Sequence, residues 1–148
     1  MTDYALLNEA LSELVRDIPH RISNLANASA LLFERLENIN WAGFYLLEGK
    51  TLVLGPFQGK TACIEIPVGR GVCGTAAAEG RTQLVPNVHE FKGHIACDGA
   101  SNSEIVIPLF KNGSVAGVLD IDSPLFDRFD ECDREGLEAF AKIIEKIL

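Results

Sequence analysis

The sequence lacks three features that would place the protein in a well-defined class. It has no apolar stretch long enough to cross a bilayer, and its N-terminus lacks the basic and apolar regions of a secretory signal. It also lacks an excess of basic residues, since 13 Lys and Arg stand against 21 Asp and Glu and give a formal net charge of −8. This balance argues against nucleic acid and against anionic membrane surfaces as partners. We therefore expect a cytoplasmic protein that binds neither nucleic acid nor membranes.

The four cysteines lack the spacing of the common metal and redox motifs. None of Cys63, Cys73, Cys97 and Cys132 belongs to a Cys-x-x-Cys pair. A zinc site built from the first three with His94 is an alternative that the spacing does not support, and we predict no metal. Permanent disulfides are not expected in a reducing compartment. The thiols are therefore either buried bystanders or reactive groups.

The helical segments lie at the two ends of the chain. Apolar residues at helical spacing predict helices at about 2–16 and 20–36, and a last helix that starts after Asp130 and runs to the C-terminus. A chain of 148 residues with 47% hydrophobic residues suits one domain with its own core. We therefore predict a single α+β domain, 1–148, with N-terminal helices at about 2–38, a sheet and its loops at about 40–122 and a C-terminal helix at about 130–148.

The central part of the chain reads as short strands joined by turns. Glu48-Gly49-Lys50 and Lys111-Asn112-Gly113 are hairpin signals, and the second contains Asn-Gly, the strongest of them. Alternating and apolar runs then predict six strands, with a short helix between the third and the fourth. These strands are expected at about 41–47, 52–57, 62–67, 82–85, 103–110 and 114–121, and the short helix at about 72–78. The order predicts a mostly antiparallel six-stranded sheet flanked by helices.

The polar loop before the fifth strand is the first candidate for chemistry. It is rich in small residues, with Cys97 at its centre and Glu104 at its exit into an apolar run. A thiol in such surroundings is a candidate redox site. A Cys–His hydrolase dyad with His89 or His94 is a weaker alternative, because no third orienting residue is recognisable. Cys132 lies among acidic residues and is interpreted as a bystander.

Two acids and two aromatic residues recur at strand spacing. Asp120 and Asp122 are two residues apart, so they project from one face of their strand. That face is either solvated or part of a pocket, in which case repulsion makes one acid take up a proton near neutral pH. Glu104 starts the partnering strand and can join them. Trp41 and Tyr45 are four residues apart and form either the floor of a ligand pocket or an ordinary core cluster.

Five motifs carry a resemblance to a known family. They are NWAGFYL at 40–46, LGPFQG at 54–59, IPVGRGVCG at 66–74, GHIACD at 93–98 and GVLDIDS at 117–123. These stretches resemble the free methionine-R-sulfoxide reductases, which are enzymes built on a GAF domain. The resemblance covers nearly the whole chain. It implies a GAF-like fold and the reduction of free L-methionine R-sulfoxide to L-methionine, with thioredoxin as electron donor and no cofactor.

The resemblance also implies roles for individual residues. The family's nucleophile falls on Cys97, and its recycling thiols fall on Cys63 and Cys73. Its pocket acids and aromatics fall on Glu104, Asp120, Asp122, Trp41 and Tyr45. The implied cycle oxidises Cys97 to a sulfenic acid, closes an intramolecular disulfide and reopens it with thioredoxin. We favour Cys63 as the first resolving thiol and Cys73 as its relay or substitute, and the identity of the proton-donating acid stays open.

A function from another class is compatible with the same fold. A GAF domain can be a non-catalytic sensor that binds a small molecule, and the fold does not decide between sensor and enzyme. The cysteines and acids favour the enzyme, because a binding module needs no such set of thiols. The N-terminal helices leave room for a homodimer.

Overall fold

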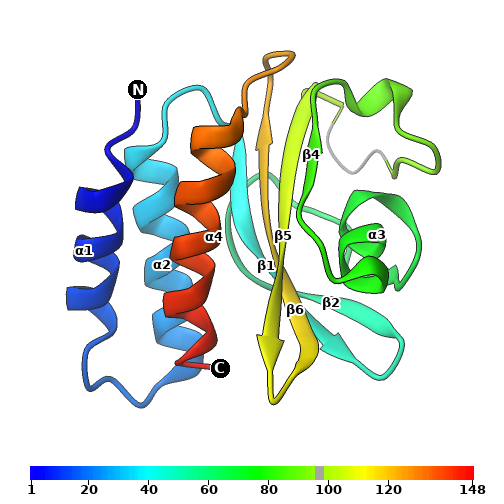
Figure 1. The fold of residues 1–148 in the computed structure, drawn as a ribbon. Helices are drawn as coiled ribbons and strands as arrows, with labels where there is room; N and C mark the ends of the chain where they lie inside the picture. The colour runs from blue at the N-terminus through cyan, green and yellow to red at the C-terminus, as the bar shows by residue number, and fades with distance from the viewer. Residues whose placement is uncertain (96–98) are drawn as a thin grey trace.

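The computed structural model describes residues 1–95 and 99–148 and forms three layers (Figure 1). Helices α2 (Arg21–Arg35) and α4 (Glu131–Glu145) lie against one face of a six-stranded sheet, and α1 (Tyr4–Val15) packs on both of them. Helix α3 (Gly71–Glu79) covers part of the opposite face. No helix in the described part of the chain combines the length and the hydropathy of a membrane span.

The sheet has the strand order β3-β2-β1-β6-β5-β4, and every pairing between its described strands is antiparallel. Its centre is formed by β1, β6 and β5, and its margins by β2, β3 and β4. The strands are β1 (Trp41–Glu48), β2 (Thr51–Gly59), β3 (Glu65–Pro67), β4 (Gln83–Val85), β5 (Ser103–Lys111) and β6 (Ser114–Ser123). A 3₁₀ turn, η1 (Val88–Glu90), follows β4. The predicted fold class is confirmed.

Both predicted hairpins are present, and their turns explain them. In the β5–β6 hairpin, Lys111 pairs with Ser114 around Asn112 and Gly113, whose φ angles are 55° and 80°. Two left-handed residues in a two-residue loop match the twist of the strands they join, and Asn and Gly adopt that conformation at little cost. This turn fixes the register of β5 against β6, which decides where their acids meet.

Alternate residues of the central strands face different layers. Ala42, Phe44, Leu119 and Ile121 belong to the hydrophobic core under α1, α2 and α4. The residues between them face α3 and join a second cluster, in which Trp41, Tyr45, Val106 and Val118 pack with Ile66, Val72 and Ala76. The period of two along each strand therefore separates a mainly apolar face from one that mixes aromatic and acidic side chains.

The predicted strand at 62–67 is wrong in its first half. β3 begins only at Glu65, and residues 60–64 form an irregular loop in which Cys63 is half-buried. The Leu54 amide of β2 still donates to the Ile64 carbonyl, but residues 60–63 do not continue the pairing of β3 with β2. Side chains of β1 hold this loop instead. Trp41 Nε1 donates to the Lys60 carbonyl, and the Tyr45 hydroxyl donates to the Cys63 carbonyl. Cys63 is therefore on a tethered loop and not inside a strand.

Candidate functional site

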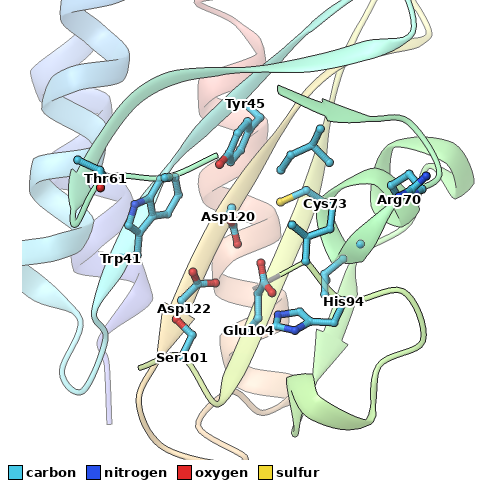
Figure 2. Close-up of a pocket in the computed structure, with 15 residues that line it drawn as sticks. Trp41, Tyr45, Thr61, Arg70, Cys73, His94, Ser101, Glu104, Asp120 and Asp122 are labelled. Carbon is cyan, nitrogen blue, oxygen red and sulfur yellow. The ribbon is translucent and has the colours of Figure 1, made fainter. Parts of the chain in front are cut away.

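A pocket lies between the sheet and the first turn of α3 (Figure 2). Its floor comes from the α3-facing residues of the central strands, and its walls come from α3 and from the loops that follow β2 and η1. The lining residues used below are Trp41, Tyr45, Arg70, Cys73, His94, Ser101, Glu104, Asp120 and Asp122. All the predicted acids and aromatics thus line one pocket, although they are up to 81 positions apart in the sequence.

The acids meet because of the strand register. Asp122 pairs with Trp41 of β1 on one side and with Glu104 of β5 on the other. Asp120 pairs with Gly43 of β1, and a side chain at Gly43 would collide with Phe57 of β2, so β1 and β2 pass closely there. Asp120 is only 6% exposed and Glu104 only 7%, so the solvated-face interpretation of this strand is wrong.

The electrostatics of the pocket are set by negative groups. Burial raises the pKa of Glu104 well above its usual value, and the charges of Asp120 and Asp122 raise it further. Within the described residues, none of the ion pairs includes Glu104 or Asp120. Among the acids of the pocket, Glu104 is therefore the group whose protonated form its surroundings favour.

Two aromatic rings line one wall of the site, and a third ring stacks against them. Trp41 stacks on Tyr45 with ring centroids 6.0 Å apart and on Phe57 with centroids 5.1 Å apart. Burial, followed by the charge of Asp120, raises the pKa of Tyr45, so its hydroxyl stays protonated. That hydroxyl donates to the Cys63 carbonyl at 2.9 Å, and the Trp41 indole donates to the Lys60 carbonyl at 3.0 Å. The wall therefore also fixes the loop that carries Cys63.

The cysteines differ sharply in their surroundings. Cys73 is a free, buried thiol in the first turn of α3, and burial, followed by the charge of Asp120, raises its pKa. Cys132 is free and exposed at the start of α4 and does not line the pocket. Cys97, the predicted nucleophile, lies outside the described residues. The assigned roles of all these thiols remain predictions.

Several lining residues were not predicted from the sequence. Arg70 precedes α3 and Ser101 precedes β5. Phe57 supports the wall from behind, since it stacks on Trp41 and β2 pairs it with Gly43. His94 was considered only for a hydrolase or zinc site, yet it lines this pocket. Its pKa is lowered by burial and, to a smaller extent, by the charge of His89. The Gly69-Arg70-Gly71 turn was the one available signal for Arg70.

One group of side chains in the pocket has the donor set of a metal site. The sulfur of Cys73 and one carboxylate oxygen each of Glu104 and Asp120 lie within 4.8 Å of one another. Among the described residues, this is the group of three or more such side chains whose donor atoms lie that close together. It differs from the zinc site of cysteines and His94 that was considered from the sequence. The same atoms also form an anionic recess for an organic cation.

Comparison with known proteins agrees with this architecture. The GAF domain family matches residues 6–148. The chain is 58% identical over 145 residues to the free methionine-R-sulfoxide reductase of Escherichia coli, covering 98% of this chain and 88% of that protein.

Solved structures give the same result. The reduced form of fRMsr from Staphylococcus aureus is 59% identical, with a TM-score of 0.97 over 100% of this chain and 96% of that one. Free methionine-R-sulfoxide reductase from Neisseria meningitidis, solved in complex with its substrate, is 46% identical, with a TM-score of 0.94 over 97% and 87% of the two chains. The chain is a GAF domain and belongs to the free methionine-R-sulfoxide reductase family.

Proposed function

We propose that the protein reduces free L-methionine R-sulfoxide to L-methionine in the cytoplasm, with thioredoxin as the reductant. The observation that carries the proposal is the convergence of three carboxyl groups and an aromatic wall on one buried pocket. This pocket occurs in a chain that is 58% identical to the reductase of E. coli over nearly its full length. A free amino acid offers an ammonium group for the acids and a methyl sulfoxide for the aromatic wall.

Glu104 is the proton donor in this proposal. A sulfoxide sulfur becomes electrophilic when its oxygen accepts a proton or a strong hydrogen bond. Only a carboxyl group that keeps its proton at neutral pH can donate in this way, and the raised pKa of Glu104 supports that role. Asp120 and Asp122 then hold the ammonium group of the substrate.

The chemical step oxidises one thiol and reduces one sulfoxide. The Cys97 thiolate attacks the sulfoxide sulfur, oxygen passes to the cysteine sulfur, and methionine leaves as the thioether. Cys97 is left as a sulfenic acid. A second thiol condenses with it, which releases water and forms a disulfide, and two thiols of thioredoxin then reduce that bond by exchange.

Cys63 is the better resolving thiol in this scheme. It is disulfide-bonded in the structure and half-buried on its loop, whereas Cys73 is free and fully enclosed. Burial and the neighbouring acids raise the pKa of Cys73, which lowers the fraction of thiolate available for exchange. These differences support Cys63 as the partner of Cys97 and leave Cys73 without an essential redox role.

The test is a single-turnover assay without added reductant. Reduced protein is mixed with the R or the S epimer of free L-methionine sulfoxide, and the methionine formed and the thiols lost are both counted. We expect about one methionine and about two lost thiols per chain with the R epimer alone, as the proposed disulfide chemistry requires. Cys97→Ser should form no methionine, while Cys132→Ser serves as the matched control.

Two outcomes would contradict the proposal. Equal turnover of both epimers would remove the stereochemical assignment. No methionine from either epimer, with all thiols retained, would favour the non-catalytic sensor, and binding of the sulfoxide without reaction would then be measured by calorimetry.

A further inference from the structure

The pocket holds a cluster whose chemistry goes beyond the reductase cycle. Cys73, Glu104 and Asp120 present one sulfur and two carboxylate groups within 4.8 Å of one another, and all three side chains are buried. The proposed reaction uses the two acids for the substrate but has no essential task for Cys73. A buried thiol between two acids is also an unusual packing element, because its neighbours are polar.

A second observation shows that this cluster has unused capacity for a cation. Oδ1 of Asp120 is buried and has no hydrogen-bond partner in the described part of the protein, although the residue is only 6% exposed. Figure 2 shows the Asp120 carboxylate pointing into the pocket between the Cys73 sulfur and the Glu104 carboxyl group. A buried acceptor without a partner costs free energy that a bound cation recovers.

We propose that Cys73, Glu104 and Asp120 form a site for a divalent transition-metal ion such as Zn²⁺, and that the bound ion blocks the pocket. A thiolate ligand selects Zn²⁺ over Mg²⁺ and Ca²⁺, which prefer all-oxygen ligands. The ion takes a thiolate and two carboxylates, so the protons of Cys73 and Glu104 both leave to solvent on binding.

The geometry needs only small adjustments. Zn²⁺ bonds of about 2.0–2.3 Å place tetrahedral ligands roughly 3.3–3.8 Å apart. The present separations are 4.8 Å or less, so side-chain rotations that close the cluster by about 1 Å suffice. The three protein ligands leave a fourth position open toward the pocket, which a water molecule fills.

The proposed site keeps all its ligands when the enzyme is oxidised to the disulfide form. A site made of several cysteines would lose ligands in that form. Cys73 is a free thiol in the structure while Cys63 is disulfide-bonded. A zinc site of the cysteine type would need Cys63 as a thiol. The proposed site therefore binds metal in both the reduced and the disulfide form of the protein.

The test is a titration of the full chain with Zn²⁺ alone, after thiol reductants have been removed. Calorimetry gives affinity and stoichiometry, and Co²⁺ as a substitute reports the thiolate ligand through its near-ultraviolet absorption. We expect one ion per chain in both redox forms. Cys73→Ala and Asp120→Asn should each lower the affinity about tenfold or more, as loss of a ligand should cost at least as much as loss of its orienting neighbours. Cys63→Ser and Cys132→Ser should bind like the parent.

Three results would overturn the proposal. They are no binding by the parent, binding by the reduced form alone, and unchanged affinity in Asp120→Asn. Unfolding curves of the metal-free variants show whether each one is folded, and Glu104→Gln replaces any variant that is not.

The effect on catalysis rests on the proposed function and is measured separately. Zn²⁺ should raise KM for the sulfoxide and leave kcat unchanged, because the ion and the ammonium group compete for Asp120 and the ion also takes Glu104. Tight binding with a constant KM would overturn the blocking part, whereas an inactive parent enzyme that still binds Zn²⁺ would count against the reductase assignment alone.

Discussion

The two faces of the central strands come from the same stretches of sequence and behave as opposites. On the helix side, Phe44, Leu119 and Ile121 are fully buried among aliphatic and aromatic neighbours. On the α3 side, the neighbouring positions carry Glu104 and Asp120, which are almost as deeply buried. Burying apolar area stabilises the fold, whereas burying like charges opposes it.

The difference shows how one sheet divides stability from chemistry. The hydrophobic stabilisation from the helix side offsets the free-energy cost of burying a cluster of acids on the other side. On the α3 side, burial raises the pKa of Glu104, and Oδ1 of Asp120 has no hydrogen-bond partner among the residues that the structure describes. We therefore expect substitutions on the two faces to have opposite effects on stability and on function.

The largest effect on stability is expected for Phe44→Ala. The ring is fully buried, and removing it leaves a cavity that should cost about 3–5 kcal/mol. The matched substitution on the α3 side is Asp120→Asn, which keeps the shape and removes one buried charge, so it should be neutral or stabilising. Urea unfolding of both variants measures their free energies of unfolding. A loss of stability in Asp120→Asn as large as that in Phe44→Ala would contradict the contrast between the two faces.

The second prediction concerns the pH dependence of stability. The folded state keeps the Glu104 proton at pH values where the unfolded chain has lost it, because the folded pKa is raised. The parent protein should therefore lose stability as pH rises above about 4.5, by up to about 1.4 kcal/mol per pH unit until the folded pKa is reached. Glu104→Gln does not titrate, so its stability advantage should grow with pH.

Unfolding midpoints between about pH 5 and pH 8 measure this difference. Glu135→Gln is the control, since Glu135 is exposed at the surface of α4. A constant difference between Glu104→Gln and the parent would mean that Glu104 is ionised in the folded protein. In that case the proton belongs to another member of the cluster.

Sequence patterns predicted most elements of the fold and picked out the acids and aromatics that line the pocket, for local reasons. Asn112 and Gly113 specify their hairpin within four residues, and the spacing of Asp120 and Asp122 places both on one face. The direction of that face was not readable, because it depends on α3, which packs above the strands from a distant part of the sequence.

Long-range register explains most of what the sequence did not reveal. Phe57 joins the aromatic wall only because β2 pairs it with Gly43. Residues 62–64 of the loop at 60–64 were predicted as the first half of a strand at 62–67, whereas β3 begins at Glu65. Hydrogen bonds from Trp41 and Tyr45 hold this loop away from the ladder, and neither bond has a local signature.

A smaller effect is expected for Tyr45→Phe, which tests whether the α3 side positions Cys63. The variant loses the hydrogen bond to the Cys63 carbonyl, which should cost about 1 kcal/mol of stability. In a single turnover, methionine formation should be nearly unchanged, while loss of the second thiol should slow by up to about fivefold, the rate equivalent of that energy. Rapid quenching with counting of both products separates the two steps.

Tyr4→Phe is the matched control for this measurement. The Tyr4 hydroxyl also donates a partly buried hydrogen bond, to Asp133 at 2.5 Å, but on the helix side of the molecule. It should lower stability without changing the ratio of thiols lost to methionine formed. Equal slowing in both variants would show that general loosening, and not the Cys63 loop, limits disulfide formation.

The smallest effect is expected for Cys132→Ser. Its side chain is exposed in the first turn of α4, and Asp130 and Asp133 already provide the capping box there. Stability should change by less than about 0.5 kcal/mol, as for most surface substitutions, and turnover should equal that of the parent. Urea unfolding and steady-state assays measure both. A clear loss of turnover would mean that a thiol on the helix side takes part in the redox cycle, and the separation of stability from chemistry between the two faces would then fail.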